Sequence, residues 1–178
     1  MSNKRSTSLP SHKKRYELTL NFLSTSVNLD EKILDLGIPN SLSEKMKNAG
    51  YSVDNTKENQ DLDIDYKIVK SEEYDVVTAF EIFEHMVAPF NLLREIAAPK
   101  LVASIPLRLW FAKAYWNEND PWDRHYHEFE PRQFDMLLNK SGWKIKNHEF
   151  WKSPNKSFGI RPLLRSITNR YYIVHCER

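Results

Sequence analysis

The sequence predicts an α/β fold built around a mostly parallel sheet. Two short runs, at 76–80 and 101–105, are rich in β-branched and small apolar residues, a composition typical of strands buried on both faces. A predicted helix at 87–96 separates them, and such a crossover is what two parallel strands require. Two later segments, at 143–151 and 171–177, alternate polar and apolar residues and predict an antiparallel strand pair.

Length and composition predict one domain over residues 1–178, since 40% of the residues are hydrophobic and can form a sizeable core. No apolar run approaches the roughly 20 residues that span a bilayer, and the first residues lack the apolar segment of a secretory signal. Cys176 is the single cysteine and has no internal disulfide partner. We therefore expect a cytoplasmic protein without a membrane segment.

Charge is unevenly distributed although the net charge is only +2. Residues 1–16 carry five Lys or Arg and no acid, residues 152–176 carry only bases, and acids dominate 54–75. This pattern has two interpretations: ordinary solvated surface, which we favour, or a basic edge that binds a phosphate-bearing partner. Residues 1–10 are rich in Ser and Lys, and we expect them to be disordered.

The first half of the chain predicts two strands and two helices. We expect a helix over 12–23, a strand over 31–37 that breaks at Gly37, and a strand over 51–56. Ser41 followed by Glu44 predicts a capping box that starts a helix running to residue 48, with Gly50 just beyond its end. The polar segment 57–65 predicts a loop with at most a short edge strand.

The second half of the chain also predicts helices and strands in alternation. Pro89 suits the first turn of the helix over 87–96, and Pro131 and Gly142 suit the two ends of a helix over 131–141. Between them, 106–129 is a long connection rich in Trp, Tyr and Phe. Its aromatic residues have two interpretations, packing onto the core or forming a lid over a substrate, and the composition favours neither.

Several motifs resemble those of class I S-adenosylmethionine-dependent methyltransferases. The motifs are ILDLG at 33–37, FEIFEH at 80–85, LVASIP at 101–106, HEFEPRQF at 127–134 and GW at 142–143, in the order of that family and spread over residues 26–178. The resemblance implies a Rossmann-like, mostly parallel twisted sheet with a C-terminal antiparallel pair and helices on both faces. It also implies methyl transfer from S-adenosylmethionine to an oxygen or nitrogen of a small molecule.

The resemblance assigns a cofactor site to loops at the ends of the strands: Asp35, Gly37, Asn55, Asp61, Phe80 and Glu81. In it Asn55 (or Asp54) would meet the ribose and Asp61 the adenine amino group. Two departures matter. Pro39 and Ser41 stand where the family has glycines, and the segment between Gly37 and residue 75 is too short for the usual second helix and third strand. A degenerate fold that serves as a binding partner without cofactor is therefore an alternative.

Methyl transfer requires orientation and often a base that takes a proton from the acceptor. Glu81, Glu84 and His85 have the i, i+3, i+4 spacing of one helical face, and His127 follows the next predicted strand. A histidine suits a base near neutral pH. We expect these four side chains to converge at the carboxyl edge of the sheet, with His85, His127 and Glu84 as the catalytic candidates.

The same four residues also permit a divalent-metal site. Their spacing resembles that of small-RNA 3′-terminal 2′-O-methyltransferases, which combine Glu-x-x-Glu-His with a later histidine, and of quinone O-methyltransferases. A metal-dependent RNA methyltransferase is thus a further alternative. In the simpler interpretation Glu84 and His85 only cap and orient a helix. We predict a small-molecule acceptor, no metal and no RNA binding.

Overall fold

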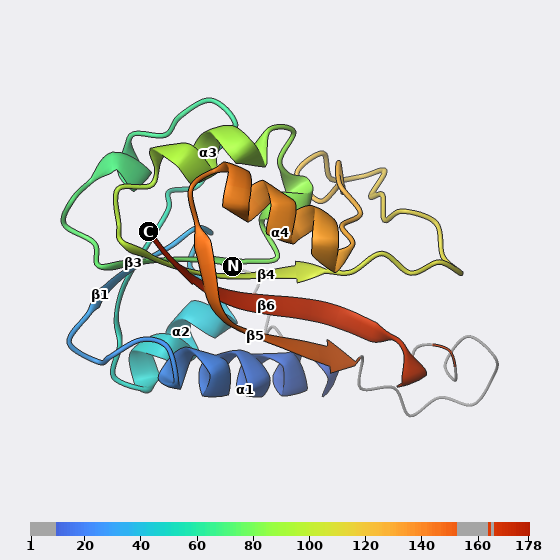
Figure 1. The fold of residues 1–178 in the computed structure, drawn as a ribbon, viewed down its shortest axis with the longest axis horizontal. Coiled ribbons are helices and arrows are strands. Elements are labelled where there is room, and N and C mark those ends of the chain that lie inside the picture. Colours follow the sequence, from blue (N-terminus) through green and yellow to red (C-terminus); the bar gives the residue numbers. More distant parts are fainter. Residues whose placement is uncertain (1–9, 153–163, 165) are drawn as a thin grey trace, which may run out of the picture.

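The computed structural model describes residues 10–152, 164 and 166–178 (Figure 1). One six-stranded sheet runs through it in the order β2-β1-β3-β4-β6-β5. The first four strands in the chain are parallel, and β6 pairs antiparallel with both β4 and β5. This arrangement confirms the predicted α/β fold with a C-terminal antiparallel pair. The predicted disorder of 1–10 lies outside the described residues, except for Pro10, which begins α1.

The elements lie close to their predicted positions. The strands are β1 (Lys32–Asp35), β2 (Ser52–Asn55), β3 (Val76–Phe80), β4 (Lys100–Pro106), β5 (Lys144–Lys152) and β6 (Asn169–Glu177). The helices are α1 (Pro10–Ser24), α2 (Ser41–Asn48), α3 (Pro89–Glu95) and α4 (Pro131–Lys140), with short 3₁₀ turns η1 (Ile68–Lys70) and η2 (Phe83–His85). No helix in the described part of the chain is long and apolar enough to cross a membrane.

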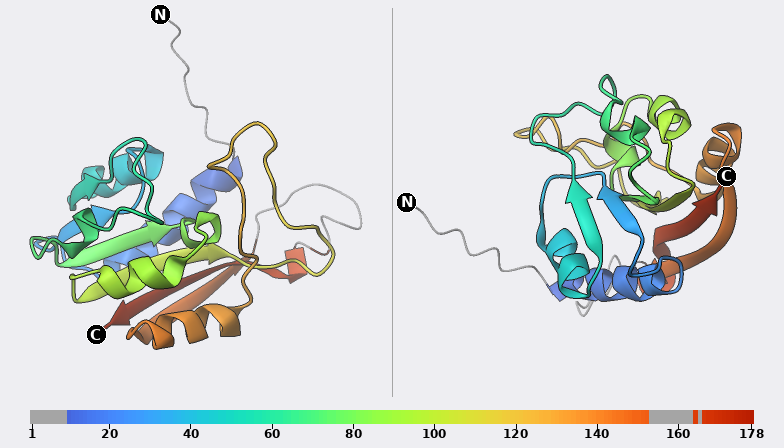
Figure 2. Two further views of the ribbon diagram at one scale, coloured as in Figure 1. Left: turned by 90° about the horizontal axis from the view of Figure 1, so that it is seen from above. Right: turned by 90° about the vertical axis from the view of Figure 1, so that its left-hand side faces the viewer.

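Helices cover both faces of the sheet, α1 and α2 on one side and α3 and α4 on the other (Figure 2). Successive strand residues point to opposite faces of the sheet, so each central strand contributes side chains to two hydrophobic cores. In β3, Val76 packs with the α1–α2 core and Val77 with the α3–α4 core. Ile33 and Leu34 divide in the same way in β1. Burial on both faces explains why these strands read as continuous apolar runs rather than alternating ones.

The start of α2 differs by one residue from the prediction. Asn40, not Ser41, is the N-cap: its Oδ1 accepts the N–H groups of Leu42 and Ser43, and the Ser43 hydroxyl accepts the N–H of Asn40. Asn and Ser are comparable N-cap residues, so composition alone does not distinguish adjacent candidates. The far ends are as predicted, because Gly50 and Gly142 follow α2 and α4 with φ of +100° and +94°.

The segment between β2 and β3 contains η1 and turns. It forms no strand, so β2 is the edge of the sheet as described, and the short edge strand considered for 57–65 does not form. This matches the shortness of the chain between Gly37 and residue 75. The aromatic connection after β4 contains two isolated β-bridges, Leu107–Phe129 and Trp116–Arg124. It extends beyond the carboxyl end of β4, where it can contribute to a site (Figure 1).

Candidate functional site

Two neighbouring cavities lie at the carboxyl ends of the parallel strands. The larger, about 500 Å³, is bounded by the loop after β1, residues 56–63, the turn after β3, and Asp120 and Trp122 of the aromatic connection. The smaller, about 110 Å³, lies between α1 and the ends of β1, β3 and β4. Both are lined by Leu36, Gly37, Asn40 and Ile82, so they share one wall. This is the edge of an open α/β sheet at which ligands bind.

Asp35 is the last residue of β1. It is buried, and it lines the smaller cavity. Its two oxygens accept hydrogen bonds from Thr78 Oγ1 at 2.7 Å and Asn55 Nδ2 at 3.0 Å. Burial raises the pKa of Asp35 to about 6, and these two hydrogen bonds oppose the rise by stabilising the carboxylate. The group is therefore mostly ionised at neutral pH, which leaves a negative charge beside the cavity.

The side chain of Asn55 joins β2 to the loop after β1. Its amide donates to Asp35 and to the Gly37 carbonyl oxygen at 3.1 Å, while its own Oδ1 is buried without a partner among the described residues. Asn55 lines neither cavity, so the structure places this predicted cofactor residue behind the wall, where its amide orients Asp35 and Gly37. Asp61 lines the larger cavity, where its Oδ1 accepts the N–H of Asp63, and Phe80 lines the smaller one.

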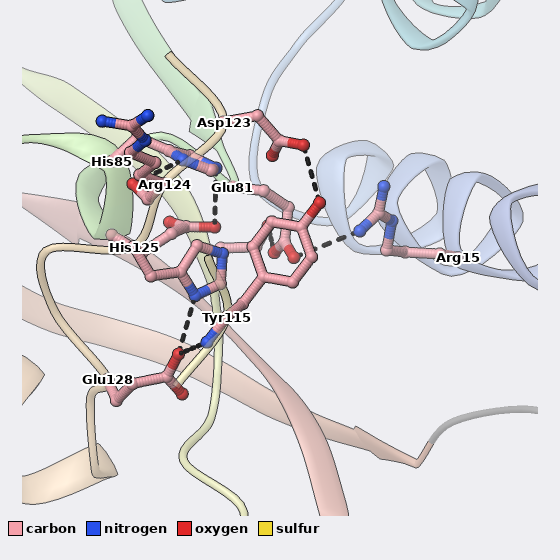
Figure 3. Close-up of polar contacts among 10 residues, drawn as sticks. Arg15, Glu81, His85, Tyr115, Asp123, Arg124, His125 and Glu128 are labelled. Carbon is pink, nitrogen blue, oxygen red and sulfur yellow. Dashed lines mark hydrogen bonds and ion pairs between the residues drawn. The ribbon is translucent and has the colours of Figure 1, made fainter. Parts of the chain in front are cut away.

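Glu81 has a left-handed backbone, with φ of +58°, directly after β3. The turn aims its carboxylate back toward β4 and α1, where it accepts hydrogen bonds from Ser104 Oγ at 2.9 Å and Arg15 Nη1 at 3.1 Å (Figure 3). Burial raises the pKa of Glu81, and the Arg15 charge opposes the rise. Arg15 is a site residue that the sequence did not indicate, because nothing in a basic helix distinguishes one arginine from its neighbours.

Glu84 and His85 belong to η2 and meet His125 of the aromatic connection. The Glu84 side chain is buried, with 1% exposed, and its Oε2 has no partner among the described residues. His85 Nε2 lies 3.8 Å from Glu84 Oε1, and the His85 and His125 rings pack edge to face at 4.9 Å. Each of the three residues offers one atom that could bind a metal ion, and these three atoms all lie within 4.8 Å of one another.

Each histidine of this cluster has a defined tautomer. His85 Nδ1 lies 3.1 Å from the Arg124 carbonyl oxygen, and His125 Nδ1 lies 2.9 Å from Glu128 Oε1 (Figure 3). Both partners are acceptors, so each Nδ1 carries a hydrogen, and in neutral His85 the Nε2 is left with a lone pair. Burial lowers the pKa of His85, and burial together with the Glu81 charge raises that of Glu84 well above its usual range.

His127 does not occupy the place predicted for it. Its ring stacks on Phe129 with centroids 5.2 Å apart, and its Nε2 lies 3.3 Å from the Val87 carbonyl oxygen. Only its backbone N–H reaches the cluster, where it donates to the Glu84 carbonyl oxygen at 3.2 Å. The structure brings His125 to Glu84 and His85 instead. The sequence contained both histidines two residues apart, but spacing in a loop does not determine which side chain faces the site.

The predicted helical face of Glu81, Glu84 and His85 was wrong. The left-handed backbone of Glu81 separates it from η2, which begins at Phe83. As a result Glu81 points to Arg15 and the smaller cavity, whereas Glu84 and His85 point to His125. The four-residue set predicted for metal binding is therefore divided. The cluster of Glu84, His85 and His125 is the only group within the described residues that has the spacing to hold a metal ion.

Several solved structures are similar to this chain at low sequence identity. A SAM-dependent methyltransferase from Archaeoglobus fulgidus matches with a TM-score of 0.64 at 15% identity, over 94% of this chain and 95% of that one. Magnesium protoporphyrin IX methyltransferase from Synechocystis, solved with S-adenosylhomocysteine, matches at 0.62 and 15%, over 94% and 83%. The [4+2]-cyclase SpnF matches at 0.59 and 13%, over 93% and 82%.

No protein-family model matches the chain, and no curated protein sequence does. The structural matches establish the fold, which is that of class I S-adenosylmethionine-dependent methyltransferases. SpnF has this fold and is described as a cyclase, so the fold does not by itself determine the reaction.

Proposed function

We propose that this protein binds S-adenosylmethionine and transfers its methyl group to an oxygen or nitrogen atom of a small molecule. The observation that carries the proposal is the pair of adjoining cavities with different chemistry. The smaller one presents charges of both signs, Arg15 against Asp35 and Glu81, and the larger one is an open groove with apolar and polar walls. S-adenosylmethionine is an amino acid joined to a nucleoside. Its amino-acid part carries charges of both signs, and its nucleoside part is larger, so the molecule is divided in the same way as the two cavities.

The residues present fit the cofactor at both ends. A cavity of about 500 Å³ lies within the usual 300–1,000 Å³ of small-molecule sites. Asp61 on its wall suits an adenine amino group, and Asn55, which lines neither cavity, holds the Asp35 carboxylate and the Gly37 carbonyl oxygen of residues that do. In the smaller cavity the Arg15 guanidinium suits a carboxylate, and the carboxylates of Asp35 and Glu81 suit an ammonium group.

The loop substitutions do not remove these walls. Gly37 and Asn40 line both cavities, whereas Pro39 and Ser41 line neither. Ser41 is instead the first residue of α2, behind its Asn40 cap. The alternative of a fold that has lost its cofactor rested on these two positions, and their placement weakens it. The catalytic interpretation of Glu84 and His85 gains support from the position of His85 on the wall of the larger cavity.

The cofactor, when bound, supplies a methyl group on a sulfonium, ready for in-line displacement. The protein's part is then to orient the acceptor, exclude water and accept its proton. His85 lines the larger cavity with its Nδ1 held by the Arg124 carbonyl oxygen, so its Nε2 can accept that proton, and the His125 ring packs against it edge to face. The aromatic connection supplies the Arg124 carbonyl and Glu128 carboxylate that hold both rings in place.

Calorimetric titration of the full chain with S-adenosylmethionine and S-adenosylhomocysteine tests the proposal. We expect both to bind, and Asp61→Ala to weaken binding about fivefold to tenfold because one hydrogen bond is lost. Asp65→Ala removes a carboxylate from the same segment outside the cavity lining, and should bind as the unmutated protein does. If the unmutated protein gives no heat of binding at millimolar cofactor, the result would instead support the alternative, a binding partner that has lost its cofactor.

A further inference from the structure

The first part of the connection after β4 carries two aromatic rings that line neither cavity of the candidate site. Trp110 is 74% exposed and packs edge to face on Phe111, with the ring centroids 5.3 Å apart. Trp122, in contrast, lies on the wall of the larger cavity. Figure 1 shows the first part of the connection, drawn in yellow to the right of β4, extending well beyond the end of the sheet. Large rings in such a position are unfavourable in water unless a partner covers them.

The residues around this pair are small, aromatic or basic. Residues 108–117 include Lys113, Tyr115 and Trp116 and contain no acid. Lys113 and the alanines on either side of it are exposed. Trp and Tyr rings concentrate where water meets the hydrocarbon of a bilayer, and a lysine beside them can extend its ammonium group to the lipid phosphates. The composition is therefore typical of a segment that lies in a membrane interface.

Neighbouring elements meet at the same end of the molecule. The Leu107 N–H donates to the Arg170 carbonyl oxygen at 2.8 Å, and the Arg170 guanidinium donates to the Leu107 carbonyl oxygen at 2.7 Å. Lys152 at the end of β5 pairs with the start of β6, and the guanidinium of Arg15 lies 5.3 Å from the centre of the Tyr171 ring. These contacts bring the ends of β4 and β5, the start of β6 and the first half of α1 together (Figure 2).

The charge at this end is positive. Its exposed bases are Lys13, Lys14, Arg108, Lys113 and Lys152, and the exposed acids beside them are Glu17, Glu130 and Glu149. In the sequence, 1–16 and 152–176 contain bases and no acid. The acidic part of the connection lies elsewhere, since Asp120 lines the larger cavity. An excess of exposed bases beside exposed rings is complementary to a surface that is negatively charged and apolar beneath.

We propose that this end of the molecule binds the surface of a bilayer that contains anionic phospholipids. The rings of Trp110 and Phe111 enter the interface, while Lys113 and Lys152 remain among the lipid phosphates. Single-stranded nucleic acid also suits bases and aromatic rings, but it is bound along a groove, whereas this ring pair belongs to a protruding segment (Figure 1). The proposal does not depend on the proposed methyl transfer.

Sedimentation of the full chain with lipid vesicles tests the proposal. The vesicles consist of phosphatidylcholine, with or without phosphatidylglycerol. We expect the chain to bind the vesicles that contain phosphatidylglycerol about tenfold or more tightly than the others, and to bind less as salt is added. Trp110→Ser should weaken binding about tenfold, because a large ring no longer leaves water, and Lys113→Gln should weaken it about fivefold.

Matched variants show whether the effect belongs to this end of the molecule. Trp122→Ser removes a ring that is 62% exposed on the wall of the larger cavity, and Lys67→Gln removes an exposed base in the acid-rich stretch 54–75. Both should bind the vesicles as the unmutated protein does, with urea unfolding as the check that each variant is folded. The absence of binding to phosphatidylglycerol vesicles overturns the proposal, as does an equal loss in Trp110→Ser and Trp122→Ser. Binding of single-stranded RNA at a salt concentration where the vesicles do not bind also overturns it.

Discussion

Replacing Asp35 by Asn isolates the cost of a charge buried beside the cofactor cavity. The substitution retains the size of the side chain and an oxygen that can accept the Thr78 hydroxyl, but it removes the titrating group. Asp35→Ala would be a poorer test of binding, because it would leave both Thr78 Oγ1 and Asn55 Nδ2 without their acceptor. Asn leaves no empty space, but its amide nitrogen replaces the oxygen that accepts from Asn55 Nδ2. The loss of that hydrogen bond does not vary with pH, so the pH dependence of stability isolates the charge.

The expected magnitude follows from the pKa of Asp35, which is about 6 in the folded protein against an ordinary 3.8. The folded state binds this proton more tightly than the unfolded chain. The Asp35 contribution to stability is therefore fully present below pH 3.8 and is lost as the pH rises through 6. The free energy of unfolding loses about 3 kcal/mol of this contribution in total, and about 2 kcal/mol of the loss occurs between pH 4.5 and 7.5.

Urea unfolding of both proteins at several pH values from 4.5 to 7.5 measures this contribution. We expect the free energy of unfolding of Asp35→Asn, relative to the unmutated protein, to rise by about 2 kcal/mol over that range. Other carboxyl groups titrate in both proteins, so they cancel in the difference. A difference that does not change with pH would mean that Asp35 is not destabilised by burial, and would refute the reasoning.

Three further predictions concern the cofactor, the turns and RNA. If Asp35 faces the cofactor ammonium, the Kd for S-adenosylmethionine should rise about tenfold from pH 7.5 to pH 5 as the carboxylate is protonated, and calorimetry of Asp35→Asn should show a smaller rise, because the Glu81 carboxylate remains. Gly142→Ala should lower the free energy of unfolding by about 1 kcal/mol, because φ is +94° while a Cβ would meet nothing within 4 Å. Gly37→Ala, where φ is not positive, is its control in urea unfolding. A fluorescence titration at low salt should detect no RNA binding, and affinity that falls steeply with added salt would contradict this.

The order of strands and helices was predictable because its causes are local. Burial on both faces selects continuous apolar runs such as 76–80, and Pro89 and Gly142 mark helix ends through their own backbone preferences. The same reasoning placed the start of α2 one residue late. Asn40 and Ser41 are both good N-caps, and the choice depends on the Ser43 hydroxyl that completes the box.

The side chains of the site were less predictable because distant segments position them. Arg15 reaches Glu81 across 66 residues of chain, and its helix carries no motif. His125 was preferred over His127 by contacts inside an irregular loop, where Glu128 binds both the His125 ring and the Tyr115 N–H. No periodicity connects sequence to side-chain direction in such a loop. The spacing rule for helices likewise failed at Glu81, whose left-handed backbone interrupts the turn.

The aromatic connection is best understood through its hydrogen bonds rather than its rings. It supplies the Arg124 carbonyl to His85 and the Glu128 carboxylate to His125, and the N–H groups of Tyr126 and His127 bind the Glu84 carbonyl oxygen. Its aromatic residues are meanwhile largely exposed, Trp110 at 74% and Trp122 at 62%. Phe129 does pack into the core, whereas Trp116 packs against Tyr126 and the Arg124 guanidinium within the segment. The polar contacts anchor the segment at the carboxyl edge and place Trp122 on the wall of the larger cavity, so covering a bound ligand stays a prediction for the exposed rings.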